Sequence, residues 1–169
     1  MSSIMNRRSI RRFTEQAVEK EKIERILRAA MQAPTGHNAQ EWEFLIVQDK
    51  ETILRVSEAS PVTVAAKNAG TLIIPLFNAK HRHSANHEDL WIADLAAATE
   101  NILIQVEEEG LGAVWLSVWP YQPKMEYLSR LFDLPEHIVP FCVIPIGYKQ
   151  KEKEFDDRYD PEKIHWEKY

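Results

Sequence analysis

The spacing of apolar residues in the first third of the chain predicts one amphipathic helix followed by a loop. In "VEKEKIERILRAAMQAP" (18–34), apolar side chains recur at helical intervals with charged residues between them. The members of this apolar stripe are Ile23, Ile26, Leu27, Ala30 and Met31. Pro34 favours the end of the helix, because proline lacks an amide donor and restricts the residue before it. "PTGHNAQ" then reads as a loop, since Gly36 and Asn38 both tolerate turn conformations.

Continuous apolar runs predict a set of buried strands with two further helices between them. The strand candidates are residues 43–48, 71–77, 112–118 and 140–148. Pro75 suggests that the second strand is an edge strand or contains a bulge, because proline cannot donate to a ladder. A helix over 50–58 follows Asp49, a plausible N-cap, and another helix is predicted over 124–132.

One long helix is predicted from about residue 88 to residue 109, with Gly110 closing it as a C-cap residue. Its apolar residues spread beyond a single stripe, so we expect more than one face to be covered, and another subunit could supply part of that cover. Asp94, Glu100 and Asn101 interrupt the apolar run, which therefore does not predict a membrane span.

The C-terminal residues, about 149–169, have no apolar periodicity but are rich in aromatic side chains, whereas disordered tails are usually poor in them. We expect an extended arm that packs on a surface, with the surface of a partner as one possibility. The length of 169 residues fits one domain, so residues 1–169 are interpreted as a single unit.

Composition and charge restrict the classes of function. A hydrophobic share of 44% with 28% charged residues is ordinary for a soluble protein. The net charge of −5 argues against a general nucleic-acid binder, which needs a basic face. A single cysteine, Cys142, excludes an intramolecular disulfide framework and fits a reducing compartment. Arginines stand where a signal peptide would be apolar, so we expect a cytoplasmic protein that binds neither nucleic acid nor membranes.

Four arginines lie within "NRRSIRRF" (6–13), in a chain that is acidic overall. Arginine presents a planar fork of donors that suits phosphate oxygens, and Ser9 adds a hydroxyl. Arg7, Arg8, Ser9 and Arg11 are close enough in sequence to converge on one small anion. Taken alone, such a cluster near a terminus is more often a solvated surface.

Five stretches in order resemble the nitroreductase family of FMN-dependent oxidoreductases, especially its compact members. They are "RRSIRRF", "APTGHNAQEWEF", "WIADLAAATENILIQVEEEGLGAVWL", "LPEHIVPFCVIPIGY" and "DDRYDPEKIHW". No single motif is decisive, but the ordered set covers nearly the whole chain.

The resemblance implies an FMN site with the arginine motif at its phosphate end. It points to Arg7, Arg8 and Ser9 for the ribityl phosphate and to Arg158 as the basic residue that completes this site. Arg11 would lie near the flavin N1/O2 edge, where a cation favours the charge that develops on reduction. Lys153 is a weaker candidate for the phosphate.

The resemblance also implies that a loop from the second subunit of an obligate homodimer approaches the flavin ring. The matching residues of this loop are Pro34, Thr35, Asn38 and Gln40. His37 would lie on the substrate side, although a solvent-exposed turn residue is an equal alternative. Glu41 replaces the proline that is usual in this motif.

Leu116 and Ser117, in "WLS", match the strand end that meets the flavin near N5 and O4. Ser117 stands where larger members of the family often carry an acidic residue. No side chain is predicted to act as acid, base or nucleophile, because the flavin carries the chemistry.

The fold implied is α+β: a three-layer α-β-α sandwich with a mixed sheet of four or five strands, paired in a domain-swapped homodimer. The activity implied is that of an NAD(P)H-dependent flavin oxidoreductase, a nitroreductase. NADH or NADPH would deliver hydride in a ping-pong mechanism, and nitro-compounds, quinones or similar acceptors would take the electrons. The alternatives are a specialised flavin enzyme for reductive dehalogenation or flavin fragmentation, and a non-catalytic flavin-binding protein.

Other chemistry is less favoured. The histidines of "HRHSANHED" (81–89) lack the spacing of known metal motifs, so no metal is predicted. Ser117 has no hydrolase elbow around it, and Cys142 lies in an apolar strand. No G-x-G-x-x-G marks a Rossmann site. The tryptophans, Trp91, Trp115 and Trp119, are interpreted as core or interface residues.

Overall fold

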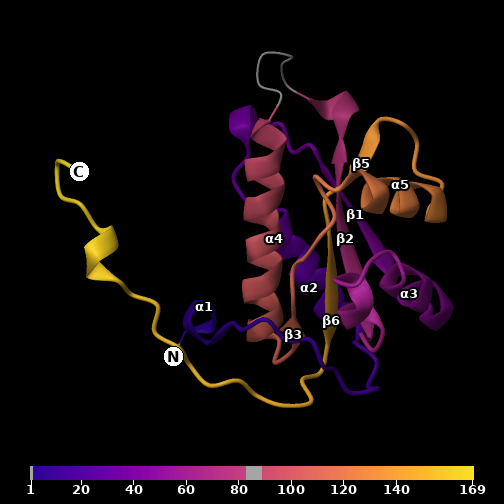
Figure 1. The fold of residues 1–169 in the computed structure, drawn as a ribbon, viewed down its shortest axis with the longest axis horizontal. Helices are drawn as coiled ribbons and strands as arrows, with labels where there is room; N and C mark the ends of the chain where they lie inside the picture. Colours follow the sequence, from indigo (N-terminus) through magenta and orange to yellow (C-terminus); the bar gives the residue numbers. More distant parts are fainter. Residues whose placement is uncertain (1, 83–88) are drawn as a thin grey trace.

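A six-stranded sheet forms the middle layer of the fold in the computed structural model, which describes residues 2–82 and 89–169 (Figure 1). The path of paired strands is β1-β2-β6-β3; β4 also pairs with β6, and β5 with β2. The strands are β1 (Trp42–Val47), β2 (Thr71–Asn78), β3 (Gly112–Ala113), β4 (Leu116–Ser117), β5 (Ile138–Pro140) and β6 (Cys142–Gly147).

The sheet differs from the predicted one in direction and in strand number. Each ladder between these strands is antiparallel, and the parallel pairing in the described residues is one bridge between Ser9 and Ala113. The prediction of a mixed sheet of four or five strands is therefore wrong in detail. The predicted strand 112–118 is divided into β3 and β4, the predicted strand 140–148 corresponds to β6, and β5 is an additional strand that shares only Pro140 with a predicted range.

Pro75 lies in the centre of the sheet, so the edge-strand alternative is wrong, whereas the bulge alternative fits: Ile73 pairs with Ile144 and Leu76 with Pro140, which leaves one extra residue on the partner side. On one side of β2 it is paired in register with Phe44. On the other side β2 pairs with β6 through residues 71–73 and with β5 through residues 76–78. Pro75 falls where the partner strand changes, and there its carbonyl accepts a hydrogen bond from the Phe141 amide at 3.0 Å. At this break in the ladder the backbone of the residue accepts a hydrogen bond but does not have to donate one, so proline, which has no amide hydrogen, is tolerated.

Two helices, α2 (Lys20–Ala30) and α4 (Leu90–Glu108), cover one face of the sheet. The predicted apolar stripe of α2 packs there, except that Met31 follows the last helical residue and is 52% exposed. Gly110 has a φ of +72° just after α4, and the amides of Gly110 and Leu111 bond back to the last turn. This is a Schellman motif, and it confirms the predicted C-cap. No helix in the described ranges is both long and apolar enough to cross a membrane.

The helices α3 (Lys50–Ser57) and α5 (Gln122–Leu131) cover the opposite face of the sheet, and their buried side chains, among them Ile53 and Leu128, form a second apolar cluster. The Asp49 side chain accepts a hydrogen bond from the Thr52 amide at 2.8 Å, which confirms the predicted N-cap. Short helical segments make the remaining turns: α1 (Ser3–Asn6), η1 (Gly36–Asn38), η2 (Thr63–Ala66), η3 (Ala79–His81) and η4 (Pro161–Lys163).

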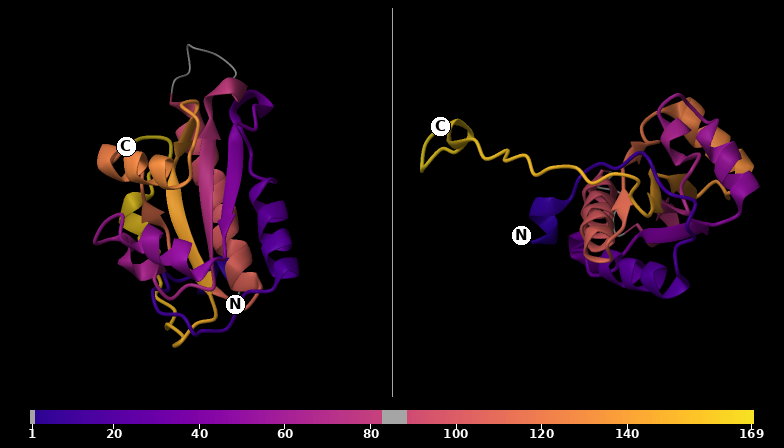
Figure 2. Two further views of the ribbon diagram at one scale, coloured as in Figure 1. Left: turned by 90° about the vertical axis from the view of Figure 1, so that its right-hand side faces the viewer. Right: turned by 90° about the horizontal axis from the view of Figure 1, so that it is seen from below.

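The C-terminal residues leave the lower end of β6 and run away from the sheet and its helices (Figures 1 and 2). Trp166 is 82% exposed and Tyr159 is 72% exposed on this segment. In this single chain the segment contacts the rest of the protein mainly at its beginning.

Candidate functional site

The arginine motif runs along β3 with its backbone fixed to the sheet. The Ile10 amide donates to the Ala113 carbonyl at 2.8 Å, and Phe13 forms a bridge with Lys149. Ile10 and Phe13 are buried, whereas Arg7, Arg8 and Ser9 are half-buried and Arg11 is exposed. The apolar residues of the motif therefore anchor it, and the anchored backbone holds the polar side chains in place.

Gly112 allows this close approach, because a Cβ at this position would lie 2.8 Å from three atoms of Ile10. Gly112→Ala is expected to push the arginine motif away from β3 and to lower the free energy of unfolding by about 1–3 kcal/mol, the usual cost of overpacking. If FMN binds at this motif, the affinity for FMN should fall together with the free energy of unfolding. Urea denaturation checks the first effect, and an unchanged midpoint would contradict the close packing.

Arg8 carries a buried donor that has no partner. Its Nε donates to the Glu154 carbonyl at 2.9 Å, and the Phe155 ring lies 5.7 Å from the guanidinium carbon. The Nη2 atom is buried and has no hydrogen-bond partner among the described residues. A buried charged donor without an acceptor is costly, and such an atom often marks an absent ligand. An anionic oxygen fits this position.

Arg7, Ser9 and Lys153 each make one contact that involves the arginine motif. The Arg7 Nε lies 3.4 Å from a carboxylate oxygen of Glu100 on α4. The Lys153 Nζ donates to the Ser9 carbonyl at 2.8 Å. The convergence of Arg7, Arg8 and Ser9 on one anion stays a prediction, and Lys153, the weaker candidate, binds the backbone of the motif through its ammonium group.

Arg11 lies beside a cavity of about 540 Å³ between Ile10 and residues 151–154. Its guanidinium makes no hydrogen bond or ion pair within the described part of the chain. The side chain is free to contact a ligand that reaches this cavity.

The predicted ring loop, residues 34–40, has an unusual backbone that is held by a buried carboxylate. His37, Asn38 and Gln40 have φ values of 55°, 58° and 50°. Left-handed backbone is uncommon in residues other than glycine, and it persists where the surroundings require it. The Gly36 amide lies 3.1 Å from each carboxylate oxygen of Asp94, which is 7% exposed.

Hydrogen bonds within the loop also hold its shape. The Gln40 backbone amide donates to the Thr35 hydroxyl at 3.3 Å, and the Gln40 side-chain amide donates to Asn38 Oδ1 at 2.9 Å. Pro34, His37, Asn38 and Gln40 are exposed. The loop therefore presents an ordered polar surface to a ligand or to another chain.

The ring loop is attached near the beginning of α4, whereas the arginine motif is attached at Glu100 in its middle and just beyond its end. The loop is bound to Asp94 near the beginning of the helix, and Ile10 is bound to Ala113 shortly after its end. A helix of 19 residues is about 28 Å long at 1.5 Å per residue. Along α4, Asp94 lies about 9 Å from Glu100, which pairs with Arg7, and about 21 Å from Glu108 at the end of the helix, so the loop and the motif are attached to different turns of the helix.

Leu116 and Ser117 form β4, opposite Val143 and Cys142 of β6. Leu116 is buried and Ser117 is half-buried. The Ser117 carbonyl accepts a hydrogen bond from Lys124 Nζ at 2.9 Å. One lone pair of this carbonyl is therefore already used within the chain.

Of the tryptophans, Trp91 is clearly a core residue. It is 7% exposed, stacks on Phe77 at 4.5 Å between ring centroids, and meets Trp119 edge-on at 5.5 Å. Trp115 contacts the same cluster through Phe141, at 5.5 Å between ring centroids. These contacts account for the three tryptophans without a ligand.

Arg158 is not brought to the arginine motif. Its Nε lies 3.3 Å from Asp156, and its side chain is 70% exposed on the C-terminal segment that leads away from the sheet. Any part that Arg158 has in the phosphate site of this chain requires a different path of that segment or the segment of a second chain.

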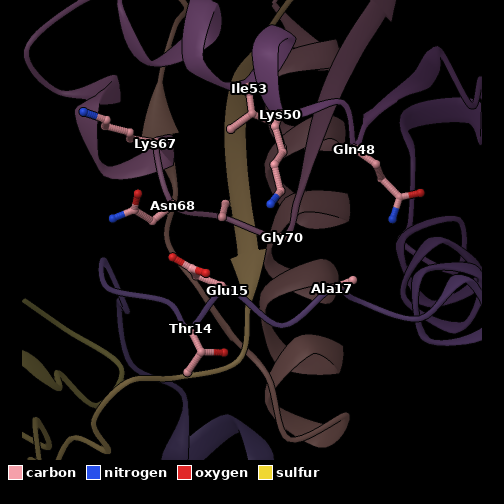
Figure 3. A pocket seen from close by; sticks show the side chains of 10 residues that line it. Thr14, Glu15, Ala17, Gln48, Lys50, Ile53, Lys67, Asn68 and Gly70 are labelled. Carbon is pink, nitrogen blue, oxygen red and sulfur yellow. The ribbon is translucent and has the colours of Figure 1, made fainter.

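Figure 3 shows a separate cavity of about 430 Å³ between the start of α3 and residues 14–17. Lys50 reaches toward Gly70, whereas Lys67 and Gln48 lie at opposite margins. None of the predicted site residues lines it, and its charged side chains do not converge.

Cys142 is a core residue. Burial raises the pKa of its thiol from the ordinary 9.0 to about 12, opposed in part by a contact with the Thr99 hydroxyl at 3.8 Å. The thiol is expected to resist iodoacetamide in the native protein at about pH 8 and to react after unfolding. The Cys142 thiol ionises at a lower pH in the unfolded protein than in the folded protein. Its contribution to the free energy of unfolding is therefore complete below pH 9 and falls as the pH rises toward 12. Iodoacetamide labelling of Cys142 in the native protein would contradict the burial of the thiol.

The histidine segment 81–89 lies mostly outside the described residues, which omit 83–88. Within the described ranges, no three side chains of histidine, cysteine, aspartate or glutamate gather as metal ligands would.

A family model described as "Nitroreductase family" matches residues 4–70 and 63–148 of this chain. A protein of Archaeoglobus fulgidus, provisionally named NADH dehydrogenase/NAD(P)H nitroreductase, is 41% identical and is matched over 100% of this chain and 98% of its own length.

Two solved structures extend the likeness to the fold. A protein of Clostridium acetobutylicum, provisionally named NADH oxidase, is 43% identical with a TM-score of 0.94, over 99% of this chain and 100% of its own. An FMN-dependent nitroreductase of Clostridium difficile is 30% identical with a TM-score of 0.91, over 99% of each chain.

Proposed function

This chain belongs to the nitroreductase family, and we propose that it is an FMN-dependent enzyme that passes electrons from NAD(P)H to a small acceptor. The resemblance found in the sequence motifs is confirmed by the family match and by the similar α+β structures. The acceptor class that we propose is a nitro-compound or a quinone, because these accept electrons from a reduced flavin without further protein chemistry.

The unpartnered Nη2 of Arg8 is the observation that carries the proposal, since it fits the phosphate of FMN. Arg7, Arg8 and Ser9 would hold that phosphate, with charge-assisted hydrogen bonds from the guanidinium groups. The name of the Clostridium difficile relative, which includes FMN, supports the same cofactor.

Arg11 would lie beside the flavin ring, where its fixed positive charge favours negative charge that develops on reduction. Leu116 and Ser117 would contact the ring from β4. When bound, FMN supplies a two-electron carrier for hydride from NADH or NADPH. The protein itself orients the cofactor and excludes water, and no side chain needs to hold or move a proton.

The ring loop requires a second copy of the chain. The family resemblance implies that this loop serves the flavin of a second chain, and in this chain the loop and the arginine motif are attached to different turns of α4. We therefore infer that each site combines the motif of one chain with residues 34–40 of the other. Thr35, Asn38 and Gln40 would then approach the ring, and His37 the substrate. Arg158 would reach a phosphate site through the extended C-terminal segment.

The absorption spectrum of the purified protein tests the cofactor, which should give a flavin band at about 450 nm. Steady-state oxidation of NADH and NADPH, with menadione or a nitrofuran as acceptor, then tests the activity. A colourless protein that binds no added FMN would contradict the cofactor. A yellow protein that oxidises neither nucleotide would contradict the activity alone.

A further inference from the structure

The beginning of the C-terminal segment packs against the arginine motif through three consecutive residues, Lys153, Glu154 and Phe155, which we call the arm root. Lys153 donates to the Ser9 carbonyl, the Glu154 carbonyl accepts from Arg8 Nε, and Phe155 lies over the Arg8 guanidinium. Each of the three residues thus contacts the motif, and two of them contact Arg8 itself.

These contacts restrict how the Arg8 guanidinium can turn. A guanidinium group is planar, so a hydrogen bond at Nε together with an aromatic ring over the central carbon defines its plane. The Nη2 atom then stays buried and without a partner. Little of the side chain's freedom remains to be lost when an anion binds there.

We propose that the arm root positions Arg8 for the anionic group, so that Phe155 contributes to phosphate binding without touching the phosphate. This inference rests on the proposed function, in which the anion is the phosphate of FMN. Because the contacts are shared, FMN binding and docking of the arm root stabilise each other by the same factor.

Phe155 is the residue that can be tested without altering the charge of the site, and it is 41% exposed, so its removal leaves the core intact. Phe155→Ala is expected to weaken FMN binding about two- to fivefold, the usual size of an exposed cation–π contact. Phe155→Leu should show a similar loss, whereas Phe155→Trp should keep the wild-type affinity. Leu54→Ala, which truncates another apolar side chain that is 41% exposed, serves as the control.

A double-mutant cycle separates positioning of Arg8 from a general effect of the arm. FMN dissociation constants are measured by flavin fluorescence for the wild type, Phe155→Ala, Arg8→Ala and the double variant. If Phe155 acts through Arg8, Phe155→Ala causes no further loss once Arg8 is alanine. An equal loss in both backgrounds would overturn the proposal.

Trypsin provides a second readout that does not depend on the flavin signal. Cleavage after Lys153 requires the arm root to leave the motif, whereas cleavage after Lys163 does not. FMN should slow cleavage after Lys153 relative to Lys163, and should do so less in Phe155→Ala. Equal protection at both bonds, or none at either, would contradict the linkage.

The two proposals fail in different ways. A wild-type protein that does not bind FMN contradicts the proposed function and this inference with it. A wild-type protein that binds FMN, with additive losses in the cycle, contradicts only the role of the arm root.

Discussion

Arg8→Ala is expected to weaken FMN binding roughly ten- to a hundredfold, because it removes a charge-assisted hydrogen bond that typically contributes about 1.5–3 kcal/mol. The protein should purify with little flavin but remain folded by circular dichroism, since the protein contacts that the Arg8 side chain loses are with Glu154 and Phe155, at the exposed beginning of the C-terminal segment. Titration of the apoprotein with FMN measures the affinity.

Arg7→Ala is the informative comparison. Arg7 already lies 3.4 Å from Glu100, so part of its charge is neutralised in the chain itself, and its removal should cost less affinity. Arg28→Ala, an exposed arginine of α2, should leave binding unchanged. Equal affinities for the wild type and Arg8→Ala would show that the phosphate lies elsewhere.

The second large effect is expected from mixed dimers, because we propose that each site combines the motif of one chain with the ring loop of the other. One chain carries Arg8→Ala and the other carries Asn38→Ala with Gln40→Ala. If each site takes its motif from one chain and its loop from the other, the mixed dimer contains one unaltered site and one that carries all three changes. FMN binding should therefore return to about half of the sites, although both parent homodimers bind weakly.

A dimer of the wild type with a chain that carries all three changes is the matched control. Composite sites would place a change in each of its two sites, whereas sites built from one chain would leave one site unaltered. The two arrangements thus predict opposite results for the two dimers. Recovery only in the control dimer would contradict a shared site, and a monomer that binds FMN tightly would contradict the dimer itself.

Much of the secondary structure follows from short-range patterns in the sequence. Apolar residues at helical spacing placed α2 and α4 within a few residues of their observed ends. Asp49 and Gly110 act at helix ends through bonds to residues a few positions away, so local sequence is sufficient to predict them. The resemblance of five ordered motifs was likewise sufficient for the family, although the roles of the individual site residues stay predictions.

Contacts between distant segments decided the rest. Pro75 predicted either an edge strand or a bulge, and the sequence alone could not choose between them because it does not reveal that two different strands, β5 and β6, share one side of β2. The same exchange of partners separates β5, which was not predicted, from β6, and the sheet is antiparallel through pairings that no periodicity encodes.

The site shows the same division between local and long-range effects. The arginines and the loop were visible in the sequence, because their residue types suit phosphate and turn chemistry. Asp94 appeared there only as an interruption of an apolar helix, although a buried charge of this kind needs a partner. Its partner, Gly36, lies 58 residues away, and Phe155 meets Arg8 across a still longer stretch of chain. Sequence determined which groups can bind an anion, and tertiary packing decided which of them, Arg8, has a buried nitrogen without a partner.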